Sequence, residues 1–593
     1  MGAALLAATP AAPCAASFPE IPDEAPRYKG WPVDALILEG VDKDLRESLG
    51  EGLALSGESK LLGKDKALCF VHTLREDLER TRPCLARHGM PDATIPVELE
   101  PRPNRKSLRV RFRISGSVVR GSEARVKGVP GALLDDIAPV LPEPGSVFQD
   151  AVMNRVSTNL VNALQQRGHA RATVALSVEP AGAYAVTVVF EVSPGPVCYF
   201  RRVEVVGSPD NLEGLARRST DISSGDRYHP RKLRRADESL RLLGVFGQSR
   251  GTPEPAGLDS VDVTVTVSER SPRTIEFGVG YWTDDELRVS SRWQHRNLFL
   301  GGRGFEISAL YSKFEQRLAS STWWPAVPTP RSRVSLEAAV TRNSEPNYTQ
   351  LDLSLIFSTV YRFSALNFVQ AGLDLSRVSV TPKEDSAGDI PDEQGLVSTF
   401  FAKLEFDGTN DRIRPRSGAA SKTRLEFAPE PLGVSGYLLA EEKAIGYVRL
   451  PLGAFVSGRM RVGAAHPIPG EGDLLPNRRF YSGGATSHRG FARRKLGPLD
   501  ESGDAMGGNL VFEGSVDLRF PLFKFLKGAA FVDTGQVWGR LEDVKPNQIE
   551  VAVGPGLWVD TPVGPFRVDY AVRVTTLSPE PRTQVQISIG STL

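Results

Sequence analysis

The segment FRVDYAVRV, residues 566–574, alternates apolar and polar side chains with a period of two. In an extended strand, successive side chains point to opposite faces. The larger apolar side chains therefore share one face, and Arg567, Asp569 and Arg573 share the other. The same division appears in VSLEAAV, GSVDLRF and the C-terminal VQISIGSTL. From residue 272 onward such segments follow one another, which indicates an all-β region.

The number of these segments separates a membrane barrel from a soluble sandwich, because a sandwich also alternates with its charged face toward water. Residues 272–593 hold about 16 such segments, each roughly 20 residues long with its turn, and an even number of this size is typical of outer-membrane barrels. We therefore predict a transmembrane antiparallel β-barrel of about 16 strands. Its polar face lines the lumen and its apolar face meets the lipid bilayer.

Composition excludes two broad classes of protein. The 593 residues are 40% hydrophobic and 24% charged, with a net charge of +1. These values exclude a disordered chain and a strongly basic nucleic-acid binder, so no nucleic-acid partner is expected. No stretch reaches the roughly 18 apolar residues of a membrane helix. Hydropathy alone would indicate a soluble protein, but barrel strands give only a weak hydropathy signal.

The first half of the chain repeats a small unit in which strands enclose helical segments. The clearest helical stripe is FQDAVMNRVSTNLVNALQQRG, which ends at Gly168 and is followed by two alternating strands. The array predicts three α+β units before the barrel, with boundaries at residues 25–116, 117–196 and 197–271.

The N-terminus and the cysteines carry weaker signals. Residues 1–24 have a short apolar core and small residues but lack a positive leading region, so they are either a signal-like segment or a disordered tail. Four cysteines are present, Cys14, Cys69, Cys84 and Cys198. On one straight helix Cys69 and Cys84 would be about 22 Å apart. We therefore expect free thiols.

The longest gap between predicted barrel strands, residues 468–506, contains the stretch RRFYSGGATSHRGFARRKLGP, residues 478–498. A gap of this length is usually functional or disordered, and its glycine pair and aromatic residues favour order. Several arginines would be costly facing lipid but are well placed in a polar lumen where carboxylates meet them. We predict that this loop folds inward, with Arg489 as its anchor.

The stretch RRFYSGGATSHRGF resembles the inward-folded loop motif of the POTRA-barrel outer-membrane assembly superfamily, also called the bacterial surface antigen family. In that motif an aromatic residue, a glycine pair and a Val-Arg-Gly-Tyr/Phe tip recur. The matching residues here are Gly483, Gly484, His488, Arg489, Gly490 and Phe491, with His488 in place of the usual valine. Further segments match in the family's order, namely FEVSPGPVCYFRRVEVVG, FDGTNDRIRPRSGAA, GGNLVFEGSVDLRFPL, GAAFVDTGQVW and TPVGPFRVDYAVRV.

The resemblance implies partners for the loop arginine. In the family, carboxylates on the barrel wall hold it, and the matching positions here are Asp533 and Asp517. A guanidinium binds carboxylates in a two-pronged way that lysine cannot reproduce. The alternative reading is that Arg489 merely neutralises a polar lumen.

The resemblance also implies a seam. Closure of the barrel pairs the first strand, near TIEFGVGYW, with the last, VQISIGSTL. Gly278, Gly280 and Gly590 bring no side chains to this seam, which favours a lateral opening there. Alternatively, the glycines only relieve crowding in a curved wall.

The implied function is outer-membrane protein assembly or translocation, with the N-terminal units in the periplasm. POTRA units would capture unfolded clients by adding a client strand to an exposed sheet edge, and the barrel seam would insert or secrete them. Three POTRA units resemble the TamA branch, which implies autotransporter-type or other outer-membrane clients and a TamB-like, inner-membrane-anchored periplasmic partner. The alternatives are a two-partner secretion transporter for one large exoprotein and a passive pore.

Enzymatic function is not expected. The seven histidines show no metal-ligand spacing, and neither a Gly-x-Ser-x-Gly elbow nor a P-loop is present. The sequence therefore predicts no catalytic residues, no metal and no cofactor.

Overall fold

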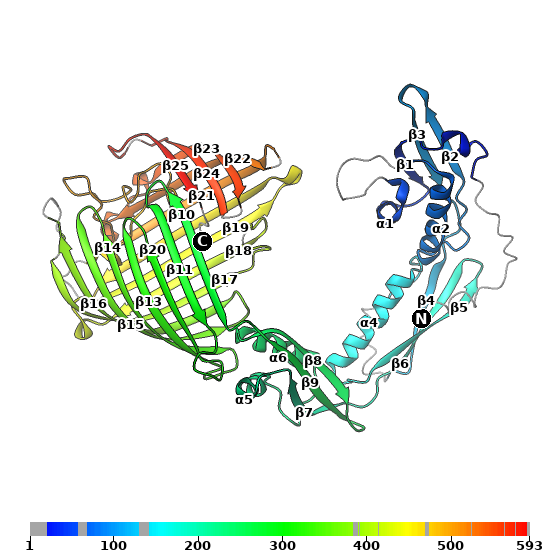
Figure 1. The fold of residues 1–593 in the computed structure, drawn as a ribbon, viewed down its shortest axis with the longest axis horizontal. Coiled ribbons are helices and arrows are strands. Elements are labelled where there is room, and N and C mark those ends of the chain that lie inside the picture. The colour runs from blue at the N-terminus through cyan, green and yellow to red at the C-terminus, as the bar shows by residue number, and fades with distance from the viewer. Residues whose placement is uncertain are drawn as a thin grey trace. The chain divides into compact units, whose positions relative to one another are not determined.

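We analysed a computed structural model of the chain (Figure 1). The structure describes residues 21–56, 68–129, 141–383, 390, 392–412, 414–468, 474–523, 525–561, 564–575 and 577–589. Most of the signal-like segment, Cys14 and Gly590 lie outside the described residues.

The N-terminal half contains three three-stranded sheets, each with one strand at its centre. The first has the order β1-β3-β2, the second β4-β6-β5 and the third β7-β9-β8. Their strands are β1 (Val33–Glu39), β2 (Val97–Arg102), β3 (Ser107–Arg113), β4 (Arg120–Lys127), β5 (Thr173–Gly182), β6 (Ala185–Ser193), β7 (Tyr199–Val206), β8 (Phe246–Pro255) and β9 (Ser260–Glu269). The helices are α1 (Lys43–Gly52), α2 (Val71–Arg87), α4 (Asp150–Gln166), α5 (Asp210–Ser219) and α6 (Pro230–Leu242).

Each unit builds its core from an apolar helix stripe and one sheet face. In α2, Leu74, Leu78 and Leu85 are fully buried in a cluster that includes Val110 and Phe112 of the central strand β3. These leucines are four and seven residues apart, which puts them on one side of the helix. The stripe of α4, Met153, Val156, Leu160 and Leu164, packs in the same way with β6.

Two features of the first unit follow from α2. The helix continues through Pro83, and Cys69 lies just before its first residue while Cys84 lies within it. Both thiols are free, as is Cys198. Among the described residues, no helix has the length and apolar character needed to cross a membrane.

The C-terminal half is a closed barrel of 16 strands in sequence order, β10 to β25, which confirms the predicted barrel. The strands are β10 (Arg273–Trp282), β11 (Glu286–His295), β12 (Gly304–Tyr311), β13 (Glu315–Pro325), β14 (Ser332–Ser344), β15 (Tyr348–Arg362), β16 (Phe368–Pro382), β17 (Glu393–Asp407), β18 (Gly418–Ala428), β19 (Tyr437–Arg449), β20 (Phe455–Pro467), β21 (Leu510–Pro521), β22 (Leu526–Trp538), β23 (Glu550–Thr561), β24 (Gly564–Arg573) and β25 (Thr583–Ile589). Neighbouring strands pair antiparallel around the wall.

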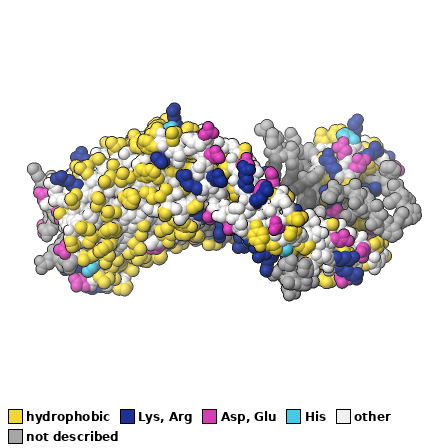
Figure 2. Space-filling model, turned by 90° about the horizontal axis from the view of Figure 1, so that it is seen from below, with side chains coloured by type: hydrophobic (Ala, Val, Ile, Leu, Met, Phe, Trp, Pro, Cys, Tyr) yellow, Lys and Arg dark blue, Asp and Glu magenta, His cyan; other side chains and the backbone are white. Residues whose placement is uncertain are grey.

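The alternation in β24 produces the expected two faces. Arg567, Asp569 and Arg573 are buried inside the barrel, whereas Tyr570 is exposed on the outside. Hydrophobic side chains cover much of the outer barrel face that Figure 2 shows. The polar lumen is therefore the place where a loop rich in arginine finds acidic partners.

Candidate functional site

The long loop between β20 and β21 is an ordered element inside the barrel. Its described residues are 468 and 474–509, and they run three residues beyond the expected end, because β21 begins only at Leu510. Short β-bridges join it to itself, as between Phe480 and Gly508 and between Ser482 and Leu496. Its tip carries large side chains with essentially no exposed surface, Arg489 and Phe491.

Arg489 meets both carboxylates that the resemblance names. Its Nε and Nη2 donate to the two oxygens of Asp533 in β22 at 2.7 and 2.6 Å, and its Nη1 donates to Asp517 in β21 at 2.7 Å. The backbone N–H of Arg489 also donates to Asp533, at 2.9 Å. This is the two-pronged geometry that only a guanidinium can form.

Three further wall residues complete the Arg489 site, and the sequence analysis did not assign them to it. Asp569 of β24 lies 3.4 Å from Nη1, and Ser515 of β21 accepts a hydrogen bond from Nη2 at 3.0 Å. The guanidinium lies 3.5 Å from the ring centre of Phe531, a cation–π contact. The alternation of FRVDYAVRV places Asp569 on the lumen face, but only barrel closure brings β24 to the loop tip.

The glycines of the motif occupy places where a side chain does not fit. Gly483 and Gly484 have φ of +108° and +109°, the left-handed range that other residues rarely adopt. A Cβ on Gly484 would lie 2.1 Å from Asp284, and one on Gly490 would lie 2.6 Å from Ala552. The glycines therefore let the loop approach the wall closely.

His488 fills the position of the usual valine without leaving a gap. Its ring is buried edge-on against Phe491, with ring centres 5.2 Å apart. Its Nε2 lies 3.3 Å from the carbonyl oxygen of Glu550. On the other side of Phe491, the Arg573 guanidinium lies 4.6 Å from the ring centre. Apolar and cation–π contacts thus support the tip together.

A second ion-pair site ties the loop to the opposite part of the wall. Arg493 donates to both carboxylate oxygens of Glu345 at 2.6 and 2.8 Å, and Arg494 approaches the same carboxylate at 3.1 Å. Arg493 also lies over the ring of Phe314, at 3.9 Å. Sequence reasoning missed Glu345, because it lies 148 residues before Arg493. The density of arginines in the loop is the only signal that pointed to such a partner.

The seam between the first and last strands is described only as far as Ile589 of β25. Among the described residues, β10 and β25 share two paired positions, Tyr281 with Ile589 and Trp282 with Ser588. Thr283 adds hydrogen bonds across the seam, because its N–H and its hydroxyl donate to the carbonyl oxygen of Ile587 at 2.9 and 3.0 Å.

Both described seam glycines lie at close approaches. A Cβ on Gly278 would lie 2.5 Å from Ser290, and one on Gly280 would lie 2.5 Å from the Trp282 ring. These contacts fit the reading in which the glycines relieve crowding. Their role in weakening the seam stays a prediction.

The loop tip contacts both sides of this seam. On the side of β10, the backbone N–H of Ala485 donates to Asp284, in the turn after that strand, at 3.2 Å. On the side of β25, Gln586 donates to the carbonyl of Phe491 at 3.1 Å. Both contacts connect the loop tip to elements of the closing pair of strands.

The sequence of the barrel region matches the model of a known protein family. The model of the Omp85 superfamily domain matches residues 297–593. The chain belongs to the Omp85 superfamily. It is an outer-membrane β-barrel protein, and its N-terminal region is periplasmic. Among the described residues, no cluster of histidine, cysteine, aspartate and glutamate could hold a metal ion.

Curated Omp85 relatives include outer membrane protein assembly factors named BamA. The protein from Nitratidesulfovibrio vulgaris is 27% identical over 383 residues, which is 63% of this chain and 48% of that protein. The protein from Neisseria meningitidis serogroup B is 22% identical over 587 residues, which is 87% of this chain and 72% of that protein. The chain thus spans about half the length of the Nitratidesulfovibrio protein. Greater similarity to the TamA branch stays a prediction.

A solved structure shows the same fold. The crystal structure of BamA from Haemophilus ducreyi lacking POTRA domains 1-3 has a TM-score of 0.64 and 18% identity. The match covers 80% of this chain and 99% of that chain. At this identity, the likeness concerns the fold alone.

Proposed function

We propose that this Omp85 protein inserts or translocates unfolded outer-membrane clients through the seam between β10 and β25. The observation that carries the proposal is the loop tip, which contacts Asp284 beside β10 and Gln586 of β25, the two sides of the seam. The loop supplies side-chain bonds that keep the closed seam in register.

Arg489 is the residue we assign to hold the loop in this position. It is fully buried, and its partners Asp533, Asp517 and Asp569 lie on three different strands. One cation therefore ties the tip to the part of the wall that leads to β25. A residue that merely neutralised the lumen would not need a two-pronged contact and a backbone bond to the same carboxylate.

The periplasmic sheets are the proposed capture sites for clients. Each has two edge strands, and main-chain bonding at an edge binds extended chains with little sequence preference. The edge strand that forms a hairpin with the central strand contains a proline in each sheet, Pro101 in β2, Pro180 in β5 and Pro253 in β8. Proline removes a donor from the edge. We therefore assign capture to the other edges, β1, β4 and β7.

The client class we propose is autotransporter-type or other outer-membrane barrels. With three periplasmic units the chain resembles the TamA branch, and on that basis we propose a TamB-like, inner-membrane-anchored periplasmic partner. Affinity purification of the full-length chain from its own envelope tests this assignment. Recovery of a secreted exoprotein in place of such a partner would favour two-partner secretion.

Reconstitution tests the insertion function itself. Full-length protein in liposomes is given a chaperone-held, unfolded autotransporter barrel, and insertion is followed by heat-modifiable mobility of the client. Liposomes with the chain should insert clients at least about tenfold faster than empty liposomes. A rate equal to that of liposomes holding an unrelated 16-stranded porin would overturn the proposal and leave a passive pore.

A further inference from the structure

The outer face of the barrel has a hollow of about 560 Å³ over strands β12 to β17. Its volume lies within the roughly 300–1,000 Å³ typical of ligand sites. Paired residues define its floor, because Ile307 lies opposite Ser320 and Ala338 lies opposite both Ser320 and Leu355. The small side chains of Ser320 and Ala338 leave space between exposed leucines. The hollow therefore presents an apolar trough to the lipid.

Two arginines lie on the same outward face, above this trough. The register runs from Leu318 through Val340 and Leu353 to Arg377, and that row is part of the rim of the hollow. One pair further along the strands, the next row contains Gln316, Arg342, Leu351, Ser379 and Gln394. Both arginines are exposed.

The position of the arginines identifies the leaflet. β14 and β16 run outward, because every second strand starts at the periplasmic side where the N-terminal units join β10. Arg342 lies two residues before the outer end of β14, and Arg377 lies five before the outer end of β16. An arginine on the lipid face is costly at the midplane of the bilayer but costs little near the interface. The polar row around Arg342 thus marks the outer interface.

Within the described residues, neither arginine has an acidic partner. No described residue forms an ion pair or a hydrogen bond with the guanidinium of Arg342 or Arg377, and the rows that contain them include no acidic residue. Their Cα atoms are about 12 Å apart, because β14 and β16 are separated by two strand spacings and the two rows are two residues apart along the strands. Arginine side chains are long enough to span this distance, so both guanidinium groups can turn toward one lipid headgroup at the interface.

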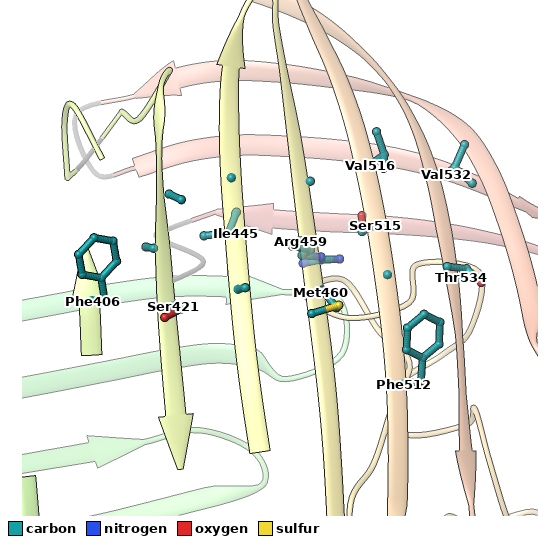
Figure 3. A pocket seen from close by; sticks show the side chains of 16 residues that line it. Phe406, Ser421, Ile445, Arg459, Met460, Phe512, Ser515, Val516, Val532 and Thr534 are labelled. Carbon is teal, nitrogen blue, oxygen red and sulfur yellow. The ribbon is translucent and has the colours of Figure 1, made fainter. Parts of the chain in front are cut away.

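A second hollow on the barrel differs from the first in the charged residues beside it. It has a volume of about 610 Å³ and is lined by residues of β17 to β22, including Met460 and Val516 (Figure 3). Arg459 also lines it, but its guanidinium donates to the loop carbonyls of Thr486 and Ser487. The charged residue on the lipid face there is Glu442, which accepts a hydrogen bond from Thr423. Its charge is opposite to that of the arginines.

We propose that the hollow over β12 to β17 binds a phosphorylated lipid of the outer leaflet. Its phosphate lies between Arg342 and Arg377, and one acyl chain lies over Ser320 and Ala338. Guanidinium groups bind phosphate through paired hydrogen bonds, and the apolar trough excludes a purely soluble anion. The lipid would fix β14 to β16, on the wall away from the seam.

Native mass spectrometry of the full-length protein in detergent, titrated with lipid A, tests the proposal. The wild-type chain should bind one lipid A. Arg342→Gln together with Arg377→Gln should weaken binding at least about tenfold, while Arg342→Lys with Arg377→Lys should retain part of it. Arg250→Gln, which removes an exposed arginine of β8, is the matched charge control and should bind as the wild type does.

The acyl contact has its own matched pair of variants. Ala338→Leu fills the proposed site and should weaken lipid A binding, whereas Ala444→Leu fills the second hollow and should not. Heat-modifiable mobility verifies that each variant is a folded barrel. Undiminished binding by the double glutamine variant, or equal binding of phosphatidylcholine and lipid A by the wild type, would overturn the proposal.

Discussion

Arg489 illustrates how one side chain can hold a long loop inside a wet barrel. It has no exposed surface, and its bonds to Asp533 and Asp517 connect it to two adjacent strands. Removal of one partner from a buried ion pair typically costs about 3–5 kcal/mol, because the other charge remains uncompensated. A continuous hydrogen-bonded wall tolerates such a local loss. A loop tip does not, so the effect should concentrate on the loop.

Arg489→Ala should therefore still reach the outer membrane as a heat-modifiable barrel, while its loop becomes sensitive to protease and client insertion falls at least about tenfold. Arg489→Lys should recover only part of the activity, because one ammonium cannot form both prongs. Limited proteolysis and client insertion measure the two effects. Normal insertion with a protected loop in Arg489→Ala would contradict the assignment.

The pair itself is tested by Asp533→Asn. This variant should resemble Arg489→Ala, and the double variant should be little worse than either single variant, because both remove one interaction. Insertion rates of the four proteins form a double-mutant cycle. Fully additive defects would show that the two residues act independently.

Asp77 makes the stability of the first periplasmic unit depend on pH. Its buried carboxylate accepts hydrogen bonds from the N–H groups of Ala54 and Leu55 at 2.8 and 2.9 Å, and burial raises its pKa. A pKa raised by folding means that this group stabilises the fold fully below its unfolded pKa of about 3.9. That contribution is lost as the pH rises through the higher folded pKa.

In the periplasmic fragment, residues 25–271, the unfolding free energy of the wild type should thus fall relative to Asp77→Asn as the pH rises above about 3.9. Urea unfolding at a series of pH values measures the difference. Asp92→Asn, which changes an exposed carboxylate in the same unit, is the control. Parallel curves for wild type and Asp77→Asn would exclude the raised pKa.

At the scale of elements, much of the architecture could be predicted because it depends on local periodicity. The apolar stripe of α4 and the alternation of β24 each appear within a few residues of sequence. The inward loop with its arginine tip was predicted from charge and from the family motif. Its closeness to Asp533 and Asp517 was implied by matching positions.

The remaining contacts of the loop depend on barrel closure. Asp284 and Ala485 are 201 residues apart, and Gln586 lies 95 residues after Phe491. Which wall residues face the tip depends on strand tilt and stagger, which a single sequence does not display. Glu345 and Asp569 were missed for the same reason.

The edge strands of the periplasmic sheets carry a prediction of their own. A photoreactive amino acid at Val206, an exposed residue of β7, should cross-link an unfolded client, whereas one at Thr252 in the proline-containing β8 should not. Cross-linked products are identified by mass spectrometry. Equal yields at the two positions would show that the prolines do not direct the client.

At the scale of the whole molecule, the periplasmic units should fold without the barrel. Each contains its own sheet and its own stripe of buried helix residues, on α2, α4 and α6, which are the requirements for independent folding. Residues 25–271 expressed alone should be a monomer with mixed helix and strand content. Circular dichroism and gel filtration measure this, and a disordered spectrum would contradict it.

The central claim is that clients pass at the seam, and a reversible cross-link tests it most directly. Tyr281→Cys and Ile589→Cys place cysteines at paired positions of β10 and β25, in a chain whose native cysteines are replaced by alanine. Val516→Cys and Val532→Cys, paired between β21 and β22, are the control. The oxidised seam variant should lose client insertion at least about tenfold and regain it on reduction, while the oxidised control stays active. Full insertion by the completely cross-linked seam variant would contradict the account.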